Sequence, residues 1–193
     1  MFLQGVILSI FIGYILKGRL KNINVRKIRA IYLVLIAFFM KFILLKLTSM
    51  DILSRGAVLY VLYLTQYSLL ALFVIINRKD KYILIMGVGF LLNALVIFTN
   101  GGSMPVSLEA AKNIGFSGDS VGNGLYRIMN EKTILGFLGD KYSFYPLGFI
   151  NKFLPFNIIK PYVASLGDFV LVIGLGLYII MGMTSKKGNN KTE

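Results

Sequence analysis

The residues of this chain that could do chemistry are few, because it contains no His and no Cys. An imidazole base, a thiolate nucleophile, the common zinc sites and a Ser-His-Asp triad are therefore excluded, and we expect no metal and no cofactor. The main candidates are the carboxylates of Asp140 and Asp168. Two carboxylates can perform acid–base chemistry when their environments separate their pKa values, provided that they lie within about 10 Å of each other.

Asp168 also has a structural interpretation. It follows Ser165 by three residues and precedes an apolar run, which is the spacing of a capping box at a helix start. Its negative charge would suit the positive end of the helix dipole. Asp140, in the stretch Leu138-Gly-Asp140, has no comparable structural explanation.

A second candidate segment is the stretch 100–106, Asn-Gly-Gly-Ser-Met-Pro-Val, in which Asn100 and Met104 flank the turn residues. Gly101 and Gly102 can adopt the positive φ that commonly ends a helix, and Pro105 then prevents the helix from continuing. The pattern favours a helix cap and turn. The alternative is a small binding nest, because the backbone at glycines can approach a ligand closely.

Two amides interrupt apolar segments of helical length. Asn93 precedes Asn100 by seven residues, so both side chains lie on one helix face. An Asn inside a span must be hydrogen-bonded and usually faces other helices, and Gln66 is the predicted partner. We favour this bond between helices over the alternative, a polar path towards residues 100–106.

Lys41 is the third polar residue inside an apolar segment. An ionisable group within the membrane indicates a functional site by default. Two interpretations stay open, because Lys41 lies six residues before the end of its segment. It either snorkels outward to the headgroups or pairs with Asp140 or Asp168.

The elements that position these side chains are membrane helices. The chain has 193 residues, of which 56% are hydrophobic and 15% charged, and a mean hydropathy of +0.75. We predict an all-α integral membrane protein with about five transmembrane helices in a single domain, residues 1–193. The predicted spans are residues 3–16, 31–47, 57–76, 82–99 and 164–183. A span needs about 20 residues, so the first is short.

Basic residues predict the orientation of these spans. They cluster at residues 17–29, 78–81 and 186–191, which all fall on one side of a five-span protein. The positive-inside rule places the N-terminus outside, the loop 100–163 outside and the tail 184–193 in the cytoplasm. The net charge of +13 is dispersed between apolar blocks, so we expect the lipid bilayer as a partner and no nucleic acid.

The loop 100–163 contains all four prolines of the chain and is too long to lack structure in a compact protein. We predict short helices at residues 107–114 and 125–131. The stretch 147–154 is apolar and aromatic. We expect it either to anchor the loop as an aromatic belt or to dip into the membrane.

Three stretches carry a resemblance to a known family: the residues 100–106, the segment from Thr133 to Asp140, and Ser165-Leu-Gly-Asp168 before the last span. Their order and spacing resemble the bacterial membrane family labelled domain of unknown function 5317, from about residue 5 to 182. The resemblance implies a small multi-span protein of a family found mostly in Firmicutes. It does not supply an activity. The chain departs from the family at Tyr126-Arg127, where a His-containing stretch is expected.

Three functions compete. We favour a non-enzymatic membrane protein whose outer loop binds a ligand, another membrane protein or a second copy of the chain. The second is an outer-leaflet enzyme that uses Asp140 and Asp168. The third is a small transporter or channel lined by polar residues of the spans, although the chain lacks the internal repeats of common transporters. A single site requires Asn100, Asp140 and Asp168 to converge in space.

Overall fold

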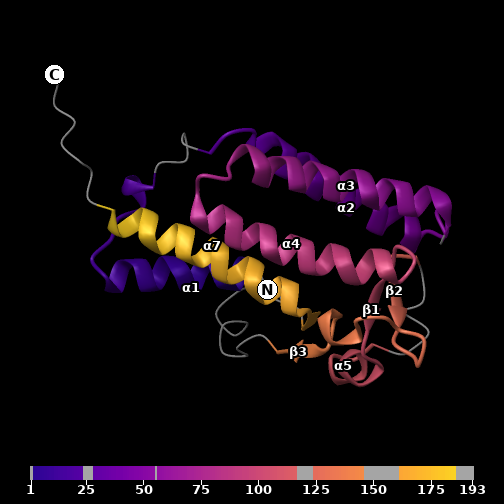
Figure 1. Ribbon diagram of the computed structural model, residues 1–193. Coiled ribbons are helices and arrows are strands. Elements are labelled where there is room, and N and C mark those ends of the chain that lie inside the picture. The colour runs from indigo at the N-terminus through magenta and orange to yellow at the C-terminus, as the bar shows by residue number, and fades with distance from the viewer. Residues whose placement is uncertain (1, 24–27, 55, 117–123, 146–160, 186–193) are drawn as a thin grey trace.

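The computed structural model describes residues 2–23, 28–54, 56–116, 124–145 and 161–185, and it is mostly helical (Figure 1). The long helices are α1 (Phe2–Ile15), α2 (Ile31–Ser49), α3 (Ala57–Ile76), α4 (Lys81–Thr99) and α7 (Leu166–Thr184). The last four have 19 or 20 residues and are apolar enough to cross a membrane. The prediction of a multi-pass helical membrane protein is confirmed at this level.

The predicted number of about five spans is wrong, because four of the described helices reach spanning length and α1 does not. α1 has 14 residues, about 21 Å of helix against a bilayer core of about 30 Å. The helix stops because Lys17 adopts a φ of 59° and Gly18 turns back to donate to the Gly13 carbonyl. The first apolar run reaches spanning length only if its flanks continue the helix, and this turn prevents it.

The helix α7 lies between α1 and α4, and the α2–α3 pair packs on α4 through α3 (Figure 1). The contact between α4 and α7 requires the glycines at their crossing. A Cβ on Gly89 would lie 2.6 Å from the carbonyl oxygen of Gly167, so a larger residue does not fit. Small residues at helix crossings let backbones approach closely in membrane proteins.

One end of the bundle is rich in basic residues, and we call it the basic end: Lys17, Arg19, Lys21, Arg29, Arg78, Lys79 and Lys81. The Arg19 N–H and the Asn22 side chain donate to the Met183 carbonyl at 2.9 and 2.8 Å, which joins the ends of α1 and α7. Asn77, at the end of α3, bonds to both backbone groups of Arg29. These bonds bring the connections of four helices to one end.

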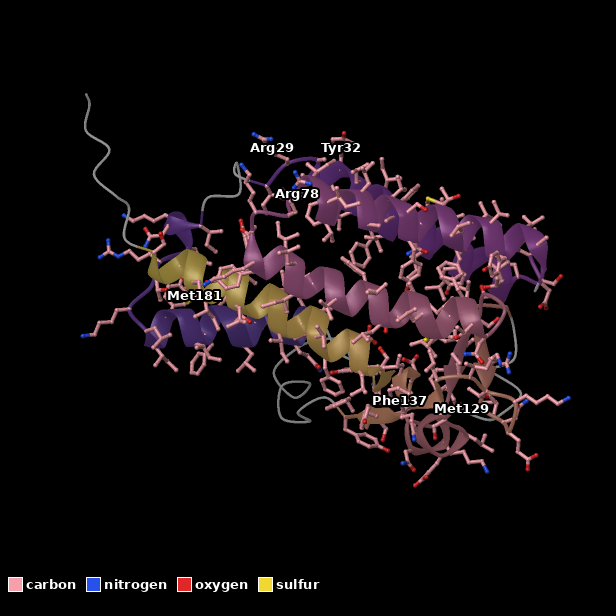
Figure 2. All side chains as sticks on the ribbon, viewed as in Figure 1. Arg29, Tyr32, Arg78, Met129, Phe137 and Met181 are labelled. Atoms are coloured by element: carbon pink, nitrogen blue, oxygen red, sulfur yellow. The ribbon has the colours of Figure 1, made fainter. Side chains whose placement is uncertain are left out.

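The segment between α4 and α7 forms a layer at the opposite end, which we call the connecting layer (residues 100–116, 124–145 and 161–164). Strands β1 (Met104–Val106) and β2 (Tyr126–Ile128) pair in parallel, and β3 (Tyr142–Phe144) pairs with β4 (Tyr162–Ala164) in antiparallel. Helix α5 (Leu108–Asn113) and the 3₁₀ turn η4 (Gly136–Leu138) complete it. Figure 2 shows Met129 and Phe137 in this layer, opposite to Arg29 and Arg78.

The predicted helix at 107–114 is confirmed by α5, whereas the predicted helix at 125–131 is wrong, because β2 lies there. The Leu125 carbonyl accepts the Met104 N–H at 2.8 Å, and the Leu125 side chain is fully buried. Pairing with a distant strand therefore decides the local structure, and the two small sheets make the all-α description incomplete. The stretch 147–154 lies outside the described residues.

The connecting layer shares a core with the helices. One hydrophobic cluster joins Leu44, Leu59, Tyr63, Val96 and Ile97 of the helices to Met104, Leu125 and Leu138 of the layer. The Tyr162 hydroxyl also bonds to the Gln4 side chain of α1 at 2.7 Å. The layer is therefore packed onto the sides of α2, α3 and α4, and it positions the residues that follow.

Candidate functional site

The start of α7 is bonded to the middle of α4 through a polar junction. The Asn93 amide donates to Asp168 Oδ1 at 3.0 Å, and its oxygen accepts the Ser165 hydroxyl at 2.8 Å. The Ser165 hydroxyl accepts the Asp168 N–H, and Asp168 Oδ2 accepts the Ser165 N–H, so the predicted capping box is confirmed. Asn93 joins two helices as predicted, but its bonds go to α7 and not to Gln66.

Lys41 and Gln66 lie at the level of this junction. Both line a cavity of about 50 Å³ together with Asn93 and Asp168, which we call the bundle cavity. Lys41 is partly buried, and the Gln66 Oε1 atom is buried without a hydrogen-bond partner. Of the two interpretations of Lys41, its position in this cavity fits the one in which it faces the carboxylates. A cavity of this size and polarity can hold water.

Asp140 reaches the same region from the connecting layer, through the backbone of two strands. Its N–H donates to the Pro105 carbonyl at 2.9 Å, and its own carbonyl accepts the Ser107 N–H at 2.8 Å. The next residue, Lys141, donates to the Ala164 carbonyl at 3.1 Å. Since Ala164 immediately precedes the capping box, this antiparallel register brings Asp140 beside the start of α7.

The Asp140 side chain is 7% exposed, and its Oδ1 atom has no hydrogen-bond partner. Burial raises the pKa of this carboxyl to about 8, the negative charge of Asp168 adds to the rise, and Lys41 opposes it. A carboxyl whose pKa is this high is mostly protonated at neutral pH. The two carboxyls therefore differ in their hydrogen bonds: one oxygen of Asp140 has no partner, whereas both oxygens of Asp168 accept a bond.

Tyr126, on β2, belongs to the same electrostatic group. The charge of Lys41 lowers the pKa of its hydroxyl, whereas burial, Asp140 and Asp168 raise it, and the balance is a rise. We call these four residues the charged cluster: Lys41, Tyr126, Asp140 and Asp168. They come from α2, β2, the segment between η4 and β3, and α7, which are far apart in the sequence.

A second cavity, of about 290 Å³, lies on the connecting-layer side of this cluster, and we call it the layer cavity. Its apolar lining consists of Val106, Ala111, Ile114, Phe116, Pro161 and Val163. Its polar lining consists of Tyr126, Asp140 and Tyr162. An apolar pocket with a few convergent polar groups and a shifted pKa is the usual form of a small-molecule site.

Asn100 lies in a separate structural joint. Its side chain accepts the Ile134 N–H at 3.1 Å and donates to the Ile134 carbonyl at 2.7 Å, which fastens the layer to the end of α4. Gly101 and Gly102 have φ values of 70° and 81°, and the Gly102 N–H donates to Ile97. This geometry is the predicted cap and turn.

The residues predicted as one site therefore divide into two groups. Met104 is buried in the shared core, and Pro105 supports Asp140 through its carbonyl. Neither Asn100 nor the two glycines line the two cavities described above. Asp140 and Asp168 converge with Lys41, and Asn100 does not join them.

The sequence interpretation missed three tyrosines. Tyr67 lines the bundle cavity, Tyr126 lines the layer cavity, and Tyr63 is 2% exposed in the shared core. One signal was available, because Tyr63, Gln66 and Tyr67 have the i, i+3, i+4 spacing of a single helix face. Among the described residues, no group of three or more His, Cys, Asp or Glu could hold a metal ion.

The chain belongs to the family of unknown function DUF5317, whose family model matches residues 22–180. This match confirms the resemblance carried by the three sequence stretches. No curated protein and no solved structure matches the chain. The function of this family is unknown, so a function for the chain must be inferred from the geometry of the site.

Proposed function

We propose that this chain is a non-enzymatic, multi-pass protein of the bacterial cytoplasmic membrane that binds a small amphiphile in the layer cavity. The observation that carries the proposal is Asp140, a buried carboxyl with a free Oδ1 atom in the wall of a largely apolar cavity. Burying a polar atom without a partner costs about 1–3 kcal/mol. A ligand that supplies the missing hydrogen bond would remove this cost.

The distribution of basic residues supports access from outside the cell. The positive-inside rule places the basic end in the cytoplasm, and the connecting layer then faces the extracytoplasmic side. All residues that line the layer cavity belong to that layer. A small amphiphile from the outer leaflet or the medium is therefore the ligand class that we propose.

The charges of the cluster define the preferred headgroup. When Asp140 is ionised, two carboxylates, Asp140 and Asp168, face the single ammonium group of Lys41, so the cluster has one negative charge in excess. A cationic headgroup would balance that charge and lower the pKa of Asp140. We therefore propose that an amine headgroup binds better than a hydroxyl of the same chain length, and that a carboxylate binds least well.

The outer-leaflet enzyme has less support. Both oxygens of Asp168 already accept hydrogen bonds, one from Asn93 and one from Ser165, so this carboxylate is committed to the helix junction. A transporter or channel has one specific observation in its favour. The bundle cavity lies within the spans and is lined by Lys41 and Asp168 of the charged cluster. Flux of labelled amines into proteoliposomes tests this second candidate.

The binding proposal is tested with octylamine, octanol and octanoate, which share a tail and differ in headgroup. The purified protein, in polymer nanodiscs, is titrated with each, and its unfolding temperature is measured at pH 7. We expect octylamine to raise the temperature most, and we expect Asp140→Asn to remove its advantage over octanol. Glu109→Gln, which removes an exposed carboxylate of α5 outside the cavity, is the matched control.

A second variant tests the location of the site. Ile114→Phe narrows the layer cavity without touching the charged cluster, so it should weaken the binding of all three amphiphiles. Equal shifts for the three compounds in the native chain, or unchanged binding in both variants, would contradict the proposed site.

A further inference from the structure

The basic end contains a groove that the proposed function does not use. Its volume is about 630 Å³, and it lies where α3 ends and α4 begins. Arg29, Arg78 and Lys79 line it with cations, and Ile75 and Ile76 line it with apolar surface. The two isoleucines are 58% and 38% exposed, so an apolar strip continues from the groove along α3.

The groove is assembled by a specific contact between distant segments. The Asn77 side chain accepts the Arg29 N–H at 2.9 Å and donates to the Arg29 carbonyl at 2.8 Å. It also donates to the Phe73 carbonyl of its own helix at 2.9 Å. Asn77 is buried, so these bonds hold the backbone of Arg29 beside Arg78. Figure 2 shows the two arginines near Tyr32 at the same end of the α2–α3 pair.

The single carboxylate in the lining, Asp80, does not neutralise the cations. Its Oδ1 atom accepts the N–H groups of Tyr82 and Ile83 at 2.9 and 3.3 Å, which caps the start of α4. Helix N-termini favour a negative charge at this position. The groove therefore has three positive side chains against one carboxylate that is already used by the helix.

We propose that this groove binds the headgroup of an anionic phospholipid. The guanidinium groups of Arg29 and Arg78 suit the phosphate oxygens, because arginine binds phosphate through paired N–H donors. The acyl chain follows Ile75 and Ile76 along α3. Tyr32 is 59% exposed at the same end, where an aromatic side chain suits the level of the headgroups. A free phosphate ion would use the cations but not the apolar strip.

The test is native mass spectrometry of the full chain released from detergent, titrated separately with phosphatidylglycerol and phosphatidylcholine. We expect phosphatidylglycerol to bind at least about tenfold more tightly, because each basic residue near an anionic headgroup contributes roughly a fivefold gain. Arg29→Gln and Arg78→Gln should each weaken the binding of phosphatidylglycerol about fivefold, and that of phosphatidylcholine, whose phosphate is balanced by its choline cation, by a smaller factor. Lys132→Gln, at the opposite end, should change neither.

A further variant separates the groove from charge alone. Asn77→Ala keeps all three cations but frees the Arg29 backbone, so its phosphatidylglycerol affinity should fall by a smaller factor than in Arg29→Gln. Equal affinity for both lipids, equal losses in the Lys132→Gln control, or full displacement of phosphatidylglycerol by equimolar inorganic phosphate would overturn the proposal. None of these results bears on the layer cavity, so this site and the proposed function fail or succeed separately.

Discussion

Asn77 and Asn100 make the same bonds at opposite ends of the bundle. Each follows the last residue of its helix, α3 or α4, and donates to the carbonyl four residues earlier, at 2.9 Å from Asn77 and 2.7 Å from Asn100. Each also binds both backbone groups of one distant residue, Arg29 for Asn77 and Ile134 for Asn100. The same pattern of asparagine hydrogen bonds therefore occurs at both ends of the molecule.

The two asparagines differ in the segment that their hydrogen bonds attach to the helix end. Asn100 fastens a layer whose side chains, such as Leu125 and Met104, enter the shared hydrophobic core. Asn77 fastens the connection that precedes α2 by binding the backbone of Arg29, and the Arg29 side chain is exposed. The same set of hydrogen bonds therefore supports packing at one end and presents charge at the other. The consequences of breaking it should differ in size and in kind.

The largest effect expected at a fixed pH follows from Asn100→Ala. The change leaves the N–H and carbonyl groups of Ile134 without their partner, and each bond that water does not replace costs about 1–3 kcal/mol. It also loosens a layer whose side chains belong to the shared hydrophobic core. We expect a loss of about 3 kcal/mol in the free energy of unfolding. The measurement is denaturation in detergent together with limited proteolysis of the connecting layer. A connecting layer as resistant to proteolysis as in the native chain would show that Asn100 does not fasten it.

A separate effect, which accumulates as the pH changes, is the pH dependence of stability that Asp140 produces. Its pKa is raised from 3.8 to about 8 in the folded protein, so the folded state keeps a proton that the unfolded state releases. This contribution to stability is complete below pH 3.8, decreases by about 1.4 kcal/mol per pH unit as the pH rises towards 8, and is then constant.

Asp140→Asn should remove that slope, because asparagine does not titrate. The measurement is the unfolding free energy of the native chain and the variant between pH 5 and pH 9, with Glu109→Gln as the control. An unchanged slope in Asp140→Asn would show that another group causes the dependence. The basic end should instead respond to salt, through its proposed lipid site.

A smaller effect is expected for Asn77→Ala. The Arg29 backbone loses two bonds, but the flanking Ile28 and Ala30 are only partly buried, so the loss in stability should be about 1 kcal/mol. The measurement is the same denaturation experiment as for Asn100→Ala. A loss as large as that of Asn100→Ala would mean that the two asparagines contribute equally to the free energy of unfolding.

An effect of similar size is expected at the turn that follows Asn100. Gly101 has a φ of 70°, and no atom lies within 4 Å of the position that an added Cβ would take. Gly101→Ala should therefore cost about 1 kcal/mol from backbone strain alone. Gly56→Ala is the matched control, because Gly56 is equally open but has an extended φ of 162°. Equal unfolding temperatures for the two variants would show that the positive φ does not matter.

The helices were the predictable part of this molecule. Apolar runs of 19 or 20 residues, the Gly101-Gly102 stop and the Ser165–Asp168 spacing are local signals, and each has its physical cause within a few residues. The prediction of a helix at residues 125–131 failed because long-range strand pairing decides the structure there. β2 forms because Leu125 and Met104 meet across about twenty residues, and nothing within residues 125–131 records that pairing.

The candidate site shows the same division. The sequence could identify Lys41, Asp140 and Asp168 as unusual groups, because charge is rare in apolar surroundings. It could not predict that Asn100 belongs to a separate joint, since that depends on the position of Ile134. It could not identify Tyr126 either, because one tyrosine in an aromatic-rich chain carries no signal until β2 places it beside the carboxylates.

In the proposed site, Asp140 is a protonated carboxyl in the wall of the ligand cavity. The most direct measurement is infrared difference spectroscopy of the carboxyl C=O band between pH 5 and pH 9, on the native chain and on Asp140→Asn. We predict a band that titrates with a pKa near 8, is missing in Asp140→Asn, and weakens at pH 7 when octylamine is added. A carboxyl that is already ionised at pH 6, or a band that persists in the variant, would contradict the account.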